Sequence, residues 1–163
     1  MVDIIPERLK VLGGRLDEIR ELAQKYEAPN SLVLPLLWML QRQEGWVTPE
    51  GKEDIALLTG CTMIQVQEAV TFYTMFFQRE MGKYVIGVCG TLPCALCGAE
   101  GLGDYLQEKL GIKFNETTEN KKFSLIEYEC LGACSEAPLM MINETTHTKL
   151  TRAKVDEILA SLE

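Results

Sequence analysis

The chain has 163 residues, of which 24 are acidic and 16 are basic, so its formal net charge is −8. This balance argues against a nucleic-acid-binding surface, because such a surface needs a basic footprint. The longest apolar run extends from Leu32 to Leu40, is interrupted by Pro35, and is too short to span a bilayer. The amino-terminal sequence MVDIIPERLK has no apolar core of a secretory signal. We therefore expect a cytoplasmic protein without membrane insertion, whose cysteines stay reduced.

The first half of the chain, residues 1–78, has the sequence pattern of helices alone. Apolar residues recur every three or four positions from about residue 6 to residue 26, which predicts a first helix. Ser31 has the position of an N-cap for a second helix that runs to about Glu44. Short connections between amphipathic helices indicate an antiparallel helical bundle as the first domain.

Capping signals mark two further helices in this half. Thr48, followed by a proline, predicts the start of a third helix, and Gly60 predicts its end. Thr62 and Gln65 have the spacing of a capping box, which predicts a fourth helix through about Tyr73.

The second half, residues 79–163, alternates between strands and helices. The expected elements are strands at 84–89, 123–129, 139–142 and 147–150, and helices at 98–110 and after Thr151, with 115–122 as a surface loop. The order β-α-β-β-β-α fits a small sheet flanked by helices, which is a thioredoxin-like α/β topology. The whole chain is thus predicted to have an α+β fold, with this half as a second domain.

Four cysteines in two close pairs dominate the second half. Cys89 and Cys94 are separated by four residues, and Cys130 and Cys134 by three. Clustered cysteines in a reduced protein indicate a metal site before a structural disulfide. An all-thiolate set suits zinc or an iron–sulfur cluster. Zinc sites favour tighter C-x₂-C pairs, whereas a [2Fe–2S] cluster takes two cysteines on each iron, so the wider spacing favours the cluster.

Cys97 leaves two other interpretations open. Cys94 and Cys97 form a C-x-x-C motif between a predicted strand and a predicted helix, where a thioredoxin-like dithiol oxidoreductase carries its redox pair. In that case Cys94 would be exposed at a helix N-terminus with a lowered pKa. Alternatively, Cys89, Cys94, Cys97 and Cys130 match the local spacing of a plant-type ferredoxin, which would leave Cys134 without a role.

Glycines near both pairs suit close packing of backbone around a cluster. Gly90, Gly98 and Gly132 permit amide N–H groups to point at sulfur. Acidic residues lie near the cysteines in the sequence, and their charge would oppose reduction of an already anionic cluster, whereas N–H···S hydrogen bonds would favour it.

The motifs Cys89-x₄-Cys94 and Cys130-Leu-Gly-Ala-Cys134, followed by Ser-Glu-Ala-Pro138, resemble those of the thioredoxin-like [2Fe–2S] ferredoxins. Among these, the chain most resembles the E-type subunits of bacterial NADH–quinone oxidoreductases (complex I). The resemblance extends to Gly45-Trp46-Val47 and to the segment 70–76, and so covers nearly the whole chain.

This resemblance implies that Cys89, Cys94, Cys130 and Cys134 bind one [2Fe–2S] cluster. It implies a heterodimer with the flavin- and NADH-binding, F-type subunit of such complexes, inside a larger assembly at the cytoplasmic face of the inner membrane. FMN and NADH would be bound by that partner, because this chain has no G-x-G-x-x-G fingerprint after any predicted strand. Related chains also serve NAD-linked bifurcating hydrogenases and formate dehydrogenases, and the motifs do not separate these hosts.

Overall fold

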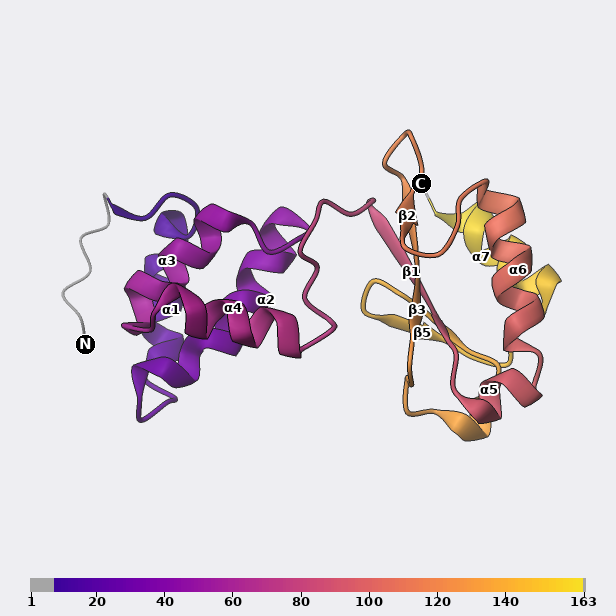
Figure 1. Ribbon diagram of the computed structural model, residues 1–163, viewed down its shortest axis with the longest axis horizontal. Helices are drawn as coiled ribbons and strands as arrows, with labels where there is room; N and C mark the ends of the chain where they lie inside the picture. Colours follow the sequence, from indigo (N-terminus) through magenta and orange to yellow (C-terminus); the bar gives the residue numbers. More distant parts are fainter. Residues whose placement is uncertain (1–7, 163) are drawn as a thin grey trace. The chain divides into compact units, whose positions relative to one another are not determined.

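The computed structural model describes residues 8–162, and the chain divides into two compact units, one ending at Glu80 and the other beginning at Met81 (Figure 1). The first contains helices, and the second combines helices with a sheet, so the predicted α+β fold is confirmed. The expected domain limits, 1–78 and 79–163, stay a prediction, because compactness alone does not show that each unit folds by itself.

Between Leu9 and Glu80 the first unit has four α-helices and two short 3₁₀ helices. They are η2 (Gly13–Arg15), α1 (Leu16–Ala23), η3 (Pro29–Leu32), α2 (Val33–Glu44), α3 (Pro49–Thr59) and α4 (Met63–Phe72). The chain turns by 118° between α3 and α4. The antiparallel order of the whole bundle stays a prediction.

The capping signals of α3 and α4 act as predicted. The Thr48 side chain accepts a hydrogen bond from the Gly51 amide, and α3 ends at Gly60 in the left-handed conformation, with φ of 70°. The Thr62 side chain accepts from the Gln65 amide while the Gln65 side chain accepts from the Thr62 amide, which completes a capping box.

The first two helices begin later than predicted. Residue 6 lies outside the described residues, and α1 begins only at Leu16. The segment before it is held by Asp54, a fully buried side chain of α3, which accepts hydrogen bonds from the amides of Lys10, Val11 and Leu12 at 2.9, 2.7 and 2.8 Å. Those amides are therefore committed to a side chain from another helix. The second helix, α2, begins at Val33 after a 3₁₀ turn, and Ser31 makes no capping hydrogen bond.

A shared apolar core joins the helices of the first unit. Its buried members come from the segments around α1 to α4 and include Ile19, Leu36, Leu40, Ile55 and Val66. After α4 the chain is fixed by the polar side chain of Gln41, whose Nε2 donates to the Met75 carbonyl at 2.9 Å and whose Oε1 accepts from the Phe77 amide at 2.7 Å.

The second unit is built around a five-stranded mixed sheet of order β2-β3-β1-β4-β5. Its elements are β1 (Tyr84–Cys89), α5 (Leu92–Leu96), α6 (Ala99–Leu110), β2 (Glu116–Thr117), β3 (Phe123–Tyr128), η4 (Cys134–Glu136), β4 (Met140–Ile142), β5 (Thr145–His147) and α7 (Arg152–Ser161). Strands β1 and β3 are parallel, and the other pairs are antiparallel.

Three elements of this unit differ from the prediction. Helix α5 lies between the expected strand 84–89 and the expected helix 98–110, where no element was predicted. Strand β2 lies in the expected surface loop 115–122, and the last strand is Thr145–His147 instead of 147–150. All three are five residues or shorter, so sequence periodicity carries little signal for them.

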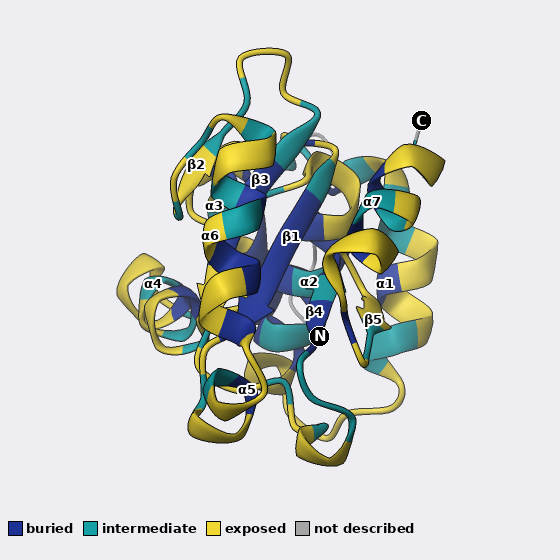
Figure 2. Ribbon diagram, turned by 90° about the vertical axis from the view of Figure 1, so that its right-hand side faces the viewer, coloured by how far each residue is buried: buried dark blue, intermediate teal, exposed yellow. Residues whose placement is uncertain are grey.

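The central strand β1 is buried along nearly all its length (Figure 2). Its Ile86 and Val88 join Leu106 of α6 and Val155 of α7 in one apolar cluster. Because β1 and β3 are parallel, their carboxyl ends meet at the same edge of the sheet, which brings the segments that follow Cys89 and Tyr128 together.

Among residues 8–162, no single helix is long and apolar enough to cross a membrane. The bent pair α3 and α4 reaches that length and apolar content only when the two helices are taken together.

Candidate metal centre

The four cysteines of the two sequence pairs come together at the carboxyl ends of β1 and β3. The thiols of Cys94 and Cys130 lie near enough to Cys89 to lower its pKa, and Cys89 and Cys134 help to raise the pKa of Cys94. Cys89 is the last residue of β1, and Cys94 lies in the short helix α5. Both views of the ribbon place α5 beside the segment that follows β3 (Figures 1 and 2).

The two pairs differ in burial. The exposed fraction of Cys89 is 1% and that of Cys94 is 0%, whereas Cys130 and Cys134 are both exposed. All are free thiols. The first pair therefore forms an inner side of the site and the second pair an outer side.

Backbone amides point at three of the sulfurs. The Gly132 amide donates to Cys130 Sγ at 3.3 Å, as the sequence predicted. The backbone of Thr91 and Leu131 lowers the pKa of Cys89, and the backbone of Leu139 acts to lower that of Cys94, as amides directed toward the sulfurs would.

Two of the three glycine amides predicted to point at sulfur donate to backbone carbonyls instead. The Gly90 amide donates to the Tyr128 carbonyl at 2.8 Å, and the Gly98 amide to the Ala95 carbonyl at 2.9 Å. Thr91, Leu131 and Leu139 were not predicted as donors, because nothing in their side chains marks their amides.

Burial and hydrogen bonding push the pKa values of the inner pair apart. Burial raises the pKa of the Cys89 thiol, but the Thr91 and Leu131 amides and the neighbouring thiols outweigh it, so the net pKa is lowered. Burial, together with hydrogen bonding to Cys89 and its charge, raises the pKa of Cys94 to about 11.

A family model describing thioredoxin-like [2Fe–2S] ferredoxins matches residues 19–163. The chain belongs to this family. The resemblance drawn from the cysteine motifs is thereby confirmed, and with it the thioredoxin-like character of the second unit.

Curated relatives of this ferredoxin-family chain cover almost its whole length. It is 41% identical to the E-type NADH-quinone oxidoreductase subunit of Rickettsia conorii, over 91% of this chain and 90% of that protein. It is also 41% identical to the NADH-quinone oxidoreductase subunit 2 of Thermus thermophilus, over 90% of this chain and 82% of that protein.

A solved structure shares the fold. An NAD+-reducing [NiFe]-hydrogenase in the air-oxidized state superposes with a TM-score of 0.68 at 19% identity, over 78% of this chain. This chain spans only 22% of that hydrogenase chain, so the likeness concerns the fold alone.

The geometry contradicts the dithiol interpretation of Cys94 and Cys97. That interpretation required an exposed Cys94 with a lowered pKa, but Cys94 is fully buried and burial raises its pKa to about 11. Cys97 is exposed at the carboxyl end of α5 and is not among the groups with the largest effects on the pKa of Cys89 or Cys94. Cys61 packs against the core of the first unit.

The donor set fits a [2Fe–2S] cluster by its chemistry. As the side chains stand, no group of three or more His, Cys, Asp or Glu residues within 8–162 could hold a metal ion. The fit rests on four mutually contacting or electrostatically linked soft thiol ligands and on amides that donate to their sulfurs, both of which are features of iron–sulfur sites.

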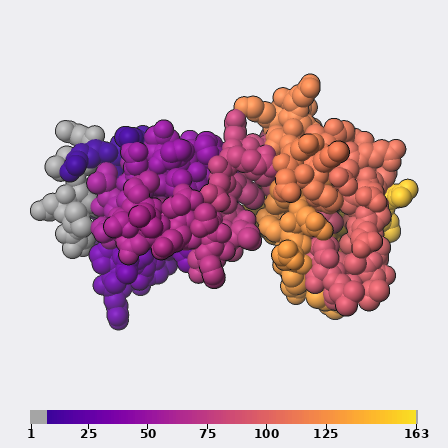
Figure 3. Space-filling model, in the orientation of Figure 1, coloured from indigo at the N-terminus to yellow at the C-terminus, as the bar shows by residue number. Residues whose placement is uncertain are grey.

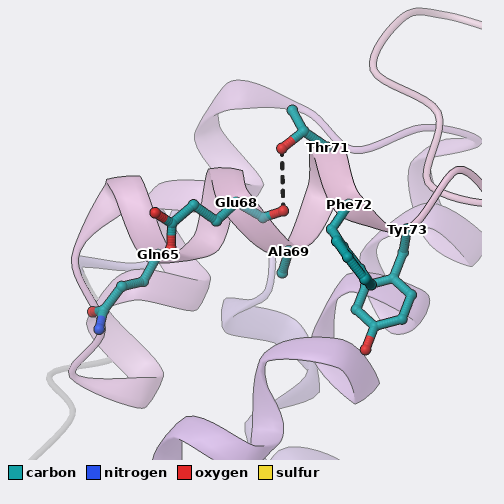
Figure 4. Close-up of a pocket in the computed structure, with 6 residues that line it drawn as sticks. All are labelled: Gln65, Glu68, Ala69, Thr71, Phe72 and Tyr73. Carbon is teal, nitrogen blue, oxygen red and sulfur yellow. Dashed lines mark hydrogen bonds between the residues drawn. The ribbon is translucent and has the colours of Figure 1, made fainter.

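A separate hollow of about 530 Å³ lies along α4 of the first unit (Figure 4). It is lined by Gln65, Glu68, Ala69, Thr71, Phe72 and Tyr73. The Thr71 hydroxyl donates to the Glu68 carbonyl at 3.1 Å, so it is engaged with the helix backbone. With one carboxylate and no nucleophile–base pair, this hollow offers no catalytic arrangement.

Proposed function

We propose that the chain is the [2Fe–2S] electron-transfer subunit of an NADH–quinone oxidoreductase, and that it exchanges single electrons with the FMN of an F-type partner. The observation that carries this proposal is the group of four thiols at the end of β1 and β3, in a chain of the [2Fe–2S] family. Two relatives that are 41% identical to this chain and are named as subunits of NADH-quinone oxidoreductase support the choice of complex.

The proposed ligands are Cys89 and Cys94 on one iron and Cys130 and Cys134 on the other. When bound, the cluster takes up and releases one electron at a time. The chain's own contribution is to hold the thiolates, to keep water from the buried inner pair, and to direct amides at the sulfurs. Amide donors favour the more negative, reduced state, because they stabilise charge on sulfur.

NADH oxidation is assigned to the partner. The sequence has no G-x-G-x-x-G motif after a strand, and Gly101-Leu-Gly103 lies inside α6. We infer that the chain works as a heterodimer with the flavoprotein within a larger complex, peripheral to the cytoplasmic face of the inner membrane.

The cofactor is tested on the anaerobically purified chain. Iron and acid-labile sulfide should each be present at about two per chain, as a [2Fe–2S] cluster requires. Finding zinc without acid-labile sulfide would contradict the proposal and would indicate a structural zinc module instead. The isolated chain should not be reduced by NADH at catalytic rates, and it should be reduced once the flavoprotein is added.

The ligand set is tested by a matched pair of serine variants. Cys97→Ser should keep the visible absorption and the EPR signal of the reduced cluster, because Cys97 is outside the thiol group. Cys134→Ser should lose the cluster or make it labile, because a serine oxygen is a poorer ligand for this site. The reverse outcome would support the plant-type ligand set that uses Cys97.

The host complex is tested by the activity of the purified assembly. NADH–quinone reductase activity without hydrogen evolution or formate oxidation is expected. Hydrogen evolution would place the chain in an NAD-linked hydrogenase, and formate oxidation in a formate dehydrogenase.

A further inference from the structure

A glycine interrupts the buried central strand of the second unit. Gly87 lies within β1 between Ile86 and Val88, and every residue of this strand after Tyr84 is buried. A glycine inside a strand weakens it and often marks a place where another group approaches the backbone closely. Gly87 does not have the positive φ that five other glycines of the chain have, so its backbone conformation does not require a glycine. The requirement is therefore for space.

The space over Gly87 is filled by the ring of Tyr128. A Cβ atom added to Gly87 would collide with Cε2 and Cδ2 of that ring. Tyr128 is the last residue of β3, and its partner in the parallel register is Cys89. The ring therefore reaches across from the end of β3 onto the neighbouring strand. Among residues 8–162 the Tyr128 hydroxyl has no hydrogen-bond partner, so the ring alone makes this contact.

The contact lies directly before both segments that carry the candidate ligands. Gly87 precedes Cys89 by two residues, and Tyr128 likewise precedes Cys130 by two. The Gly90 amide donates to the Tyr128 carbonyl at 2.8 Å, which continues the pairing one residue past the end of β1. In the space-filling view the segments that follow β1 and β3 reach the surface at the same end of the second unit (Figure 3). A shift of one strand end against the other would thus reach the cysteines within two residues.

The segment after β3 has little packing of its own to hold it in place. No residue from 129 to 138 is buried, and Cys130 and Cys134 are both exposed. The half-buried ring of Tyr128 is the last apolar side chain before this segment. Because backbone hydrogen bonds near an exposed strand end open easily, the ring is the side-chain contact that keeps the end of β3 against β1.

We propose that Tyr128 is a positioning residue for the cluster, and that its ring, seated on Gly87, fixes the spacing between Cys89 and Cys130. This inference rests on the proposed function, since it concerns how the same cluster is held. The two cysteines are assigned to different irons, so their spacing has to match the span of the cluster. Removal of a residue that orients metal ligands typically lowers metal affinity by about 10–100-fold.

The test follows two properties of the anaerobically purified holoprotein: the rate at which an iron chelator removes the cluster, and the EPR g values of the reduced cluster. Tyr128→Ala should lose iron at least about tenfold faster and should have shifted g values. Tyr128→Phe should match the unmodified chain in both properties, because the ring stays on Gly87. Tyr128→Leu, which also lacks a ring, replaces the alanine variant in this comparison if Tyr128→Ala does not fold.

The glycine provides a second arm of the test. Gly87→Ala displaces the ring, so it should speed iron loss and shift the g values as Tyr128→Ala does. In the double variant the added methyl group meets no ring, so Gly87→Ala should add nothing to the effect of Tyr128→Ala. Leu159→Ala is the control for stability. It removes a buried side chain of α7, and it should lower the midpoint of thermal unfolding without changing the g values.

Three results would overturn the positioning role and leave the proposed function standing. The first is unchanged iron loss and unchanged g values in Tyr128→Ala. The second is a pair of effects, from Gly87→Ala and Tyr128→Ala, that simply add in the double variant. The third is faster iron loss that only follows the loss of stability, with unchanged g values, as in the Leu159→Ala control. An unmodified chain that holds no [2Fe–2S] cluster would overturn both proposals.

Discussion

Replacing Asp54 with alanine is expected to destabilise the first unit far more than replacing its neighbour Glu53. The Asp54 carboxylate is fully buried and accepts the amides of Lys10, Val11 and Leu12 at 2.7 to 2.9 Å. Glu53 instead pairs with the Lys10 ammonium at the surface, where both side chains are about half exposed. The pair of variants therefore compares a buried and an exposed acid that hold the same segment.

The magnitude follows from the three hydrogen bonds. Each hydrogen bond to a charged group contributes about 1.5–3 kcal/mol, but water can partly replace the two that are only partly buried. We therefore expect Asp54→Ala to lower the free energy of unfolding by about 3–5 kcal/mol, as when one partner of a buried charged arrangement is removed. The whole free energy of unfolding of a typical domain is only about 5–15 kcal/mol. Glu53→Ala should have little measurable effect, because exposed ion pairs contribute weakly.

The assay is urea unfolding followed by tryptophan fluorescence. Both tryptophans of the chain, Trp38 and Trp46, lie in the first unit, so the fluorescence reports on that unit, while visible absorption reports on the cluster site in the second. Asp54→Asn, which keeps the side-chain shape and one acceptor oxygen, should fall between the alanine variant and the unmodified chain. Equal midpoints for Asp54→Ala and Glu53→Ala would refute the reasoning.

Two further predictions concern the second unit. Gly87→Ala should destabilise it by about 1–3 kcal/mol, because an added Cβ would lie 2.2 Å from the Tyr128 ring. Its control, Gly101→Ala in α6, meets open space and should be neutral or stabilising by up to about 1 kcal/mol in thermal unfolding. A chain of residues 81–163 should fold alone and keep the visible spectrum of the cluster, because it has its own apolar core and all four ligand candidates. A colourless, unfolded fragment would show that the two units are not independent domains.

The sequence correctly predicted those helix ends that are set by residues close together in the chain. The capping box of Thr62 and Gln65 and the left-handed end of α3 at Gly60 involve residues at most a few positions apart, so both could be predicted from the sequence. The late start of α1 could not, because its cause is Asp54, more than forty positions away. The two-residue strand β2 likewise exists only through its pairing with β3.

At the candidate site, too, some features could be predicted from the sequence and others could not. Spacing and strand ends predicted that Cys89, Cys94, Cys130 and Cys134 belong together, and their contacts agree with that expectation, although their role as ligands stays a proposal. The burial of Cys94 could not be predicted, because a single turn of helix at α5 leaves no periodic pattern in the sequence. The dithiol interpretation required an exposed Cys94, and the burial of that residue contradicts it.

The unequal burial of the two thiol pairs sets an order of access to the site. An iron donor, a chelator or an alkylating reagent that arrives from solvent meets Cys130 and Cys134 first, because Cys89 and Cys94 have almost no exposed surface. The inner thiols are correspondingly less accessible to such a reagent. Reaction with an alkylating reagent should therefore be faster at Cys130 and Cys134 than at Cys89 and Cys94.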